Sequence, residues 1–150
     1  MTFDPTAIMS KLVTIAQASG RFFKVNEFEP RGQPSNGLTL SLISGPKVPI
    51  QSSGLTKASI RWQIDGRVYS PMRPEPKDVD AKLTAAAAGY MEALCGQYTL
   101  GGLVRCIDVF GSDGEGLNST PGYLEQDSKL YRVEQIMIPL LINEAWTLTP

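Results

Sequence analysis

The strongest secondary-structure signal in the chain is the segment DVDAKLTAAAAGYMEALCG, residues 78–96. Apolar residues recur in it at helical spacing and share one face; they are Leu83, Ala87, Tyr90, Met91 and Leu94. Asp78 suits the N-cap of a helix, and Gly96 suits its C-terminal stop. The small side chains of Ala85–Ala88 allow a neighbouring element to approach closely. The segment predicts an amphipathic helix, and the proline-rich stretch Ser70–Lys77 before it predicts an extended connector.

A second helix is predicted near the N-terminus, from Asp4-Pro5 to Gly20. Asp4 suits an N-cap and Pro5 the first helical position, and apolar residues follow at helical spacing, namely Ile8, Leu12, Ile15 and Ala16. Arg21–Glu29 is rich in Phe and Val and predicts a strand. Arg31–Gly37 is dense in Gly, Pro, Ser and Asn and predicts a loop.

Two further strand signals lie between the helices. The alternation of leucines with polar residues in Leu38–Leu42 predicts a strand buried on one face, which we expect to end at Gly45-Pro46. Alternation resumes in Lys57–Ile64, is followed by Asp65-Gly66, and continues in Arg67–Tyr69. An Asp-Gly pair between two alternating segments predicts a β-hairpin with a type I′ turn.

The chain after the second helix is again rich in strand formers. Leu103–Phe110 is a nearly continuous apolar run, as expected of a central strand. A glycine-rich loop follows at Gly111–Gly116, and Gly122–Gln126 predicts a short strand. The long β-prone run Leu130–Trp146 contains Pro139, which predicts a bulge or an edge position because proline cannot donate to a sheet ladder.

These elements together indicate the fold class. A length of 150 residues suits one domain spanning residues 1–150. Runs of strands separated by two helices predict an α+β fold, with a single, mostly antiparallel sheet and both main helices packed on one face.

The composition excludes several classes of function. The chain has no histidine, which removes Ser-His-Asp and Cys-His nucleophile systems, HExxH zinc proteases and His-ligated haem. Cys95 and Cys106 cannot form a four-cysteine metal site, and we expect them to be reduced thiols of a cytoplasmic protein. The formal net charge of −1 disfavours a dedicated nucleic-acid binder. We therefore expect neither an enzyme nor a metal or organic cofactor, and no membrane association.

Two groups of side chains have spacings that are associated with chemistry. Ser44 and Lys47 match a serine–lysine pair, but the intervening Gly-Pro prevents the helical turn that such a pair needs. Asp108, Asp113 and Glu115 could place carboxylates around a hard cation, but their loop lacks the regular spacing of a calcium loop. A solvated glycine-rich turn is the preferred interpretation of these three acids.

Charge is distributed unevenly along the chain. Residues 1–77 carry ten Lys and Arg and five acids, whereas residues 78–150 carry four and ten. If the two halves expose separate faces, the basic face of one copy can meet the acidic face of the next. Such a head-to-tail contact closes into a ring, and we expect charge reversal at Arg61 and Arg67 to impair it.

Four segments of the second half carry a recognisable pattern. They are LCGQYTLGGLVRCIDVFG (residues 94–111), Pro121-Gly-Tyr-Leu124, Tyr131-Arg-Val133 and IPLLINEAW (residues 138–146). In the order and size of the elements and in these motifs, most of residues 57–146 resembles tail terminator proteins of long-tailed bacteriophages.

The resemblance implies a structural virion protein with a tail-terminator-like α+β fold. Such proteins form a hexameric ring that caps the tail tube, ends tail polymerisation and joins the tail to the head and neck. The implied partners are further copies of the chain, the major tail tube protein and a head-completion or connector protein, while genomic DNA passes through the lumen without specific binding. The implied location is the tail–neck junction of a virion assembled in the bacterial host cytoplasm.

Exposed connections are the expected contact elements in that interpretation, because loops on a rigid scaffold carry function. They are the hairpin at Asp65-Gly66 and the loop at residues 111–122. The expected subunit or partner interface comprises Arg61, Asp65, Gly66, Arg67, Asp113, Glu115 and Trp146. Trp62, in contrast, is expected in the core.

Two alternatives remain open. The first is another neck component, such as a head-completion or connector adaptor protein, or a tail tube subunit. The second, from a different class, is a small metal- or ligand-binding domain that uses Asp108, Asp113 or Glu115.

Overall fold

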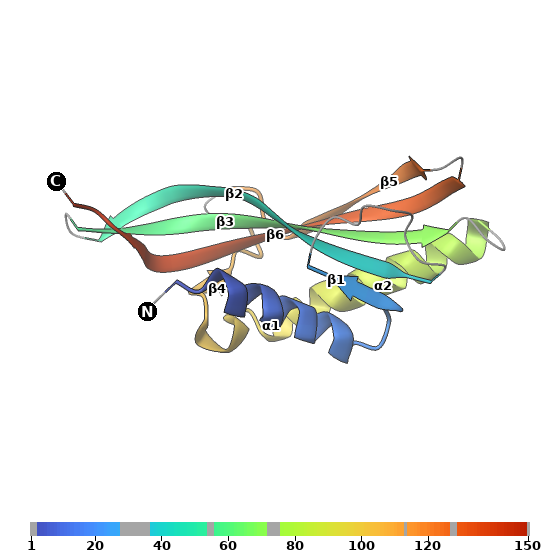
Figure 1. The fold of residues 1–150 in the computed structure, drawn as a ribbon, viewed down its shortest axis with the longest axis horizontal. Coiled ribbons are helices and arrows are strands. Elements are labelled where there is room, and N and C mark those ends of the chain that lie inside the picture. Colours follow the sequence, from blue (N-terminus) through green and yellow to red (C-terminus); the bar gives the residue numbers. More distant parts are fainter. Residues whose placement is uncertain are drawn as a thin grey trace.

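The computed structural model describes residues 3–27, 37–53, 56–71, 76–112, 114–126 and 129–149. In these ranges the chain forms a six-stranded sheet with two α-helices on one face (Figure 1), so the expected α+β fold is confirmed. The elements are α1 (Pro5–Ala18), β1 (Lys24–Asn26), β2 (Thr39–Ser53), β3 (Lys57–Pro71), α2 (Pro76–Gly96), a 3₁₀ turn (Leu100–Gly102), β4 (Cys106–Ile107), β5 (Asn118–Gln126) and β6 (Lys129–Thr147).

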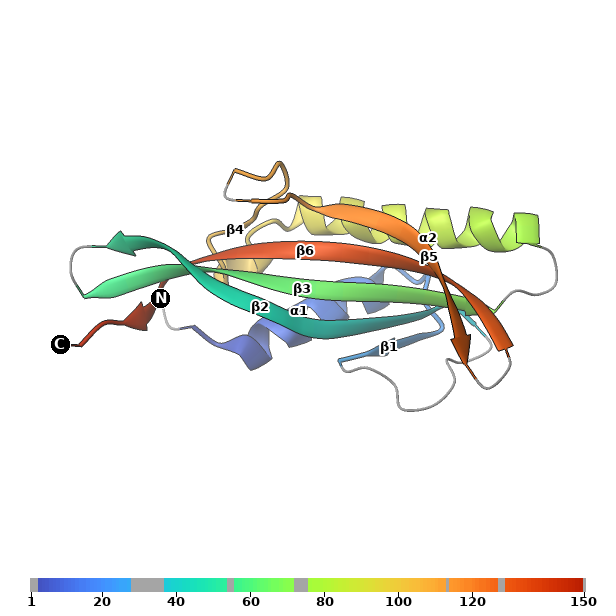
Figure 2. The same cartoon turned by 90° about the horizontal axis from the view of Figure 1, so that it is seen from above.

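The strand order separates the two halves of the chain. Across the sheet it runs β1-β2-β3-β6, and β6 pairs on its far side with both β4 and β5. Of the described strand pairs, β1–β2 is parallel and the others are antiparallel. Figure 2 shows the same division in the helices, since α1 lies toward β1 and β2 while α2 lies toward β5.

β3 is one uninterrupted strand, so the hairpin predicted at Asp65-Gly66 is wrong. Both residues pair with β2 on one side and with β6 on the other. Even-numbered residues stay buried from Ala58 to Ser70, so the period-2 pattern continues through Gly66. A type I′ turn needs positive φ at both central residues, and neither residue has it. Pairing with two neighbouring strands outweighs the local turn preference of Asp-Gly.

β2 also continues past its predicted end at Gly45-Pro46. The strand accommodates this dipeptide in a bulge, because its pairing with β3 shifts register between Ser44 and Lys47. Glycine is required at position 45, where a Cβ would lie 2.6 Å from the backbone oxygen of Gln63. Pro46 falls within the bulge, a position where a missing N–H is tolerated.

Pro139 lies inside the sheet and not at an edge, so its predicted edge position is also wrong. It is buried in β6 and pairs with Gln63 of β3. Its carbonyl accepts a hydrogen bond of 2.9 Å from the backbone N–H of Asp108, and in a strand the N and O of one residue face the same neighbour. That neighbouring position lies between β4, which ends at Ile107, and β5, which starts at Asn118. The missing N–H of proline therefore removes no ladder bond.

Other element boundaries differ from the sequence predictions. Within the predicted strand Arg21–Glu29, β1 covers Lys24–Asn26. Within the predicted central strand Leu103–Phe110, β4 covers Cys106–Ile107 and lies at an edge of the sheet. Leu100 and the two glycines after it have positive φ and turn the chain after α2. α2 begins at Pro76, so Asp78 lies in its first turn and not at its cap. Residues 28–36, which span the end of the predicted strand and most of the predicted loop, and residues 72–75 of the predicted connector lie outside the described residues.

The core fills the space between the helices and the sheet. Asp4 caps α1 as predicted, accepting from the backbone N–H of Ala7 at 3.1 Å. The Tyr90 hydroxyl of α2 donates to the carbonyl oxygen of Leu12 in α1 at 3.1 Å. Trp62 is buried as predicted. The fully buried core residues include Ile8, Leu12, Leu40, Leu42, Ile60, Trp62, Ile64, Leu83, Tyr90, Leu94 and Ile136.

The position of Gly66 within β3 is testable by substitution. Gly66→Ala should leave the free energy of unfolding unchanged or raise it by up to about 1 kcal/mol, because alanine restricts the unfolded chain. An added Cβ would meet Leu40, Leu42 and Ile136 at ordinary contact distances of 3.5–3.6 Å. Gly111→Ala is the matched control and should destabilise, because Gly111 has φ of +78° and a Cβ there would lie 2.5 Å from Gly114 O. Urea unfolding measures both, and an equal loss in the two variants would contradict the strand assignment.

Tyr90 gives a second test, based on pH. Burial raises the pKa of the Tyr90 phenol above its ordinary value. The unfolded chain releases this proton near pH 10 while the folded chain retains it, so Tyr90 lowers the free energy of unfolding as pH rises above about 10. Tyr90→Phe should cost about 1 kcal/mol at pH 7 through the lost hydrogen bond. Urea unfolding of both proteins should show this difference shrinking above pH 10, and a constant difference would contradict the assignment.

Candidate interaction site

A loop of residues 108–117 leaves the sheet between β4 and β5, opposite Pro139. Backbone hydrogen bonds close its base, since the N–H of Leu117 donates to the carbonyls of Asp108 and Val109 at 3.2 Å. Two glycines determine the backbone path of the loop, because Gly111 has φ of +78° and a Cβ on Gly116 would lie 2.5 Å from Val109 O. The loop has a defined conformation in its described residues, which exclude position 113.

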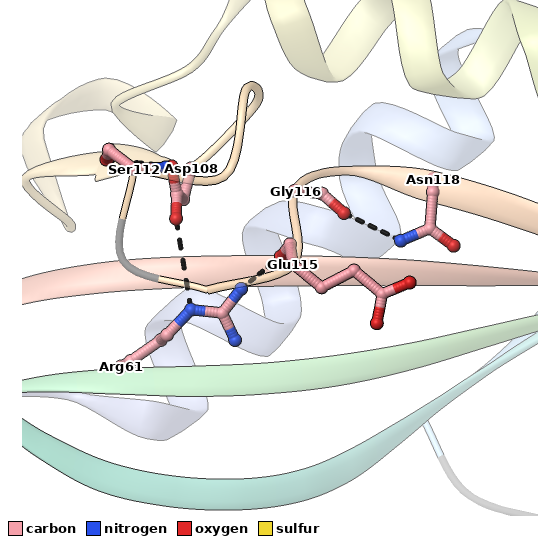
Figure 3. A network of polar contacts seen from close by, with 6 residues as sticks. All are labelled: Arg61, Asp108, Ser112, Glu115, Gly116 and Asn118. Carbon is pink, nitrogen blue, oxygen red and sulfur yellow. Dashed lines mark hydrogen bonds and ion pairs between the residues drawn. The ribbon is translucent and has the colours of Figure 1, made fainter.

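Polar contacts tie this loop to β3 (Figure 3). Asp108 Oδ1 accepts from the backbone N–H of Ser112 at 2.8 Å and from its hydroxyl at 3.0 Å. Asp108 Oδ2 lies 3.9 Å from Arg61 Nε, and Arg61 Nη2 donates to the carbonyl oxygen of Glu115. The two charged side chains are largely buried, at 13% exposure for Arg61 and 3% for Asp108. The ion pair therefore holds the loop over the face of the sheet that the helices leave uncovered.

Phe110 is the outstanding surface feature of the loop. Its side chain is 98% exposed, although its neighbours on both sides are fixed by the contacts just described. Beside it lies a mainly apolar groove of about 470 Å³ between the end of α2 and β4. The groove is lined by Cys95, Tyr98, Cys106, Ile107, Asp108, Val109, Phe110 and Ser112. An exposed aromatic beside an apolar groove is typical of a protein-binding surface.

The structure brings together two of the residues predicted at an interface, Arg61 and Glu115, but through the backbone of Glu115. Arg61 points into the loop and not into solvent. Asp65 lies in mid-strand and accepts from Gln63 Nε2 at 3.1 Å, Gly66 is buried between three side chains, and position 113 is outside the described residues.

Arg67 and Trp146 lie elsewhere. Arg67 lines a separate cavity of about 250 Å³ with Tyr69 and Gln135, on the face away from the helices. Trp146 lies near the end of β6, partly buried against the core. Sequence reasoning did not select Phe110 or Tyr98. The signal that could have identified Phe110 is its place as an aromatic residue directly before a loop of Gly, Ser and acids.

The candidate chemical groups have structural partners. Ser44 Oγ accepts from Trp62 Nε1 at 3.0 Å and from Lys47 Nζ at 3.4 Å, so it ties the β2 bulge to the core. Both oxygens of Asp108 face partners of its own chain, and Figure 3 shows the Glu115 carboxylate directed away from it. Within the described ranges, no group of three or more His, Cys, Asp and Glu side chains is placed to hold a metal ion. Cys95 and Cys106 line the same groove, and no disulfide joins them.

In the described part of the chain, no helix is both long and apolar enough to cross a bilayer.

Comparison with known proteins yields a likeness in structure alone. Neither the protein-family models nor the curated proteins contain a match to this sequence. Among solved structures, the chain is similar to a chain of the virion of a native gene transfer agent particle. The two chains are 17% identical with a TM-score of 0.47, and the alignment covers 89% of this chain and 90% of the other. Values this low assign no function.

The Arg61–Asp108 pair is testable by a double-mutant cycle. Arg61→Met leaves a buried carboxylate without its cation and should lower the free energy of unfolding by about 2–4 kcal/mol. Asp108→Asn should also destabilise, and the double variant should lose about 1–3 kcal/mol less than the sum of the single losses. Arg105→Met, at an exposed arginine nearby, is the control and should change stability by less than about 0.5 kcal/mol. Additive losses in urea unfolding would show that the two side chains are not coupled.

Proposed function

We propose that this chain is a non-enzymatic structural virion protein of the tail-terminator type. In this role its copies form a ring on the end of the tail tube, stop tail polymerisation and join the tail to the head. Its partners are further copies of itself, the major tail tube protein and a head-completion or connector protein. Genomic DNA passes through the ring without specific binding, and the protein acts at the tail–neck junction of the virion.

The observation that carries this proposal is Phe110 on its fixed loop. A fully exposed aromatic is unfavourable in water unless a partner covers it. Because the ion pair and the glycines already fix the loop, a partner that binds Phe110 orders little of the chain on binding. Such a feature favours a role in assembly over a role in catalysis. The sequence motifs at residues 94–111 and 138–146, which resemble tail terminators, include the first part of this loop with Phe110 and most of the second half of β6.

The edges of the sheet support capping as the mechanism. A cap must bind the tube end without offering its other side as a template for further subunits. Beyond the three residues that pair with β1, β2 is an outer strand. It carries register shifts at Ser44/Lys47 and Pro49/Gln51, and such bulges block strand addition. On the other side of the sheet, the N–H of Ile107 in β4 is already bonded to the carbonyl of Tyr98 at 2.6 Å. At β2 and β4, these features favour assembly through side chains over open-ended strand pairing.

Another neck component or a tube subunit would use similar surfaces. Copy number separates a ring protein from a tube subunit, and the tail length of particles made without the chain separates a terminator from another neck ring. Quantitative mass spectrometry of purified particles, against the major tail protein, should find one ring of this chain per particle. Particles made without the chain should carry tails of abnormal, extended length. Tens to hundreds of copies would make the chain a tube or decoration protein, and its absence from particles would overturn the proposal.

Phe110→Ser gives a residue-level test of the same role. The variant should unfold within about 0.5 kcal/mol of the unmodified protein, because an exposed side chain contributes little to the fold. In particles it should produce extended tails, as removal of the whole chain does. Electron microscopy measures tail length, and normal tails would contradict a role for Phe110.

A further inference from the structure

The uneven charge of the sequence becomes a spatial polarity in the fold. Figure 2 shows α1, β1 and β2 on one side of the molecule and α2, β4 and β5 on the other, because the strand order keeps the halves apart. The elements of the first side carry three lysines and no acid, and those of the second side carry four acids and two lysines. The first is therefore a basic side and the second an acidic side. Two such sides on one molecule favour a head-to-tail contact between copies.

Exposed apolar residues of the two sides lie at or beside opposite ends of the same rows of paired residues across the sheet. Val48 on β2 is 52% exposed, and its row across the strands ends at the groove on β4: Val48, Arg61, Leu141, Cys106. A second row runs from β1 to β5: Lys24, Thr39, Tyr69, Val133, Gly122. At its two ends the adjacent residues are Phe23, 75% exposed, and Tyr123, 64% exposed. Rotation about an axis parallel to the strands does not shift a copy along the strands. Each row of one copy therefore stays opposite the same row of the next copy.

The charges near the first row are complementary. Lys47 is exposed next to Val48 on the basic side. On the acidic side Glu92 is exposed on α2, one helical turn before the groove residue Cys95, and the last turn of α2 has no basic residue. The carbonyl end of a helix carries a partial negative charge, which adds to that of Glu92.

We propose that the basic side of one copy packs on the acidic side of the next, with Val48 seated in the groove beside Phe110 and Lys47 beside Glu92. The contact along the Val48 row is made by side chains, because the bulges of β2 and the Tyr98 bond to β4 oppose strand pairing at the two ends of that row. This proposal rests on the proposed function as a ring protein and identifies the contact between the subunits of the ring.

Disulfide trapping tests this contact with the full-length chain. Val48→Cys places a thiol on the basic side, and the unmodified Cys95 and Cys106 on the groove supply its partner. Mild oxidation with copper–phenanthroline over a range of protein concentrations should give a ladder of disulfide-linked multimers. Mass spectrometry should find position 48 joined to Cys95 or Cys106. Replacement of both native cysteines by serine should abolish the ladder.

Leu148→Cys is the matched control, because Leu148 is 46% exposed and lies outside the Val48 row. It should give no defined ladder. A Val48→Cys protein that forms no more intermolecular bridges than this control at any concentration overturns the proposal.

Charge exchange tests the same contact without oxidation. Lys47→Glu and Glu92→Lys should each weaken self-association by about tenfold, and the double variant should restore it because the two charges have changed places. Sedimentation velocity measures all three. Loss without restoration, or no loss, contradicts the pairing of Lys47 with Glu92.

These outcomes are separable from those of the proposed function. Bridges at position 48 in a chain that is absent from particles would keep the subunit contact and remove the capping role. One ring per particle without such bridges would keep the capping role and remove this contact.

Discussion

The position of Pro139 in the central strand determines where the chain can leave the sheet. A residue without an N–H in β6 requires a neighbour that does not need to accept a hydrogen bond at that point. The chain meets this requirement by ending β4 at Ile107 and starting β5 at Asn118, so that the loop emerges opposite the proline. The groove and Phe110 both follow from this interruption. A strand without proline would permit β4 and β5 to run as one edge.

The Arg61–Asp108 pair then gives the loop its conformation, at a cost. Taking two charges out of water is unfavourable, and a single ion pair recovers little of that cost unless hydrogen bonds satisfy both groups. Asp108 is well satisfied by Ser112, but Arg61 Nε is buried without a hydrogen-bond partner. The pair is therefore better understood as fixing one arrangement of the loop than as a source of stability. An exposed aromatic on a fixed loop loses little freedom when a partner covers it.

The sequence predicted the layers of the fold better than the ends of its strands. Both helices and the burial of Trp62 followed from local spacing and from the type of residue. The errors at Asp65-Gly66 and Gly45-Pro46 share a cause. Each is a local signal for a turn or a strand end, and in each the pairing of the strand with its neighbours, which sequence spacing does not contain, decided the outcome.

The interaction site was less predictable than the fold for a related reason. Arg61 and Asp108 are 47 positions apart in the sequence, and their meeting depends on the register between β3, β6 and β4. The uneven charge was visible in the sequence, but its spatial meaning depended on the strand order, which keeps the two halves of the chain on opposite sides. Phe110 gave no periodic signal, because a single exposed residue in a loop has none.

The same strand order has a consequence for synthesis on the ribosome. β6 is the last strand in chain order, yet β3, β4 and β5 all pair with it. Lys57 and Thr147 are 90 positions apart and are joined by a side-chain hydrogen bond. During translation the β2–β3 hairpin can form early, but the rest of the sheet has no central strand until β6 has left the exit tunnel. Contacts this distant fold slowly, so the nascent chain exposes unpaired strand edges until β6 emerges, and such edges favour aggregation.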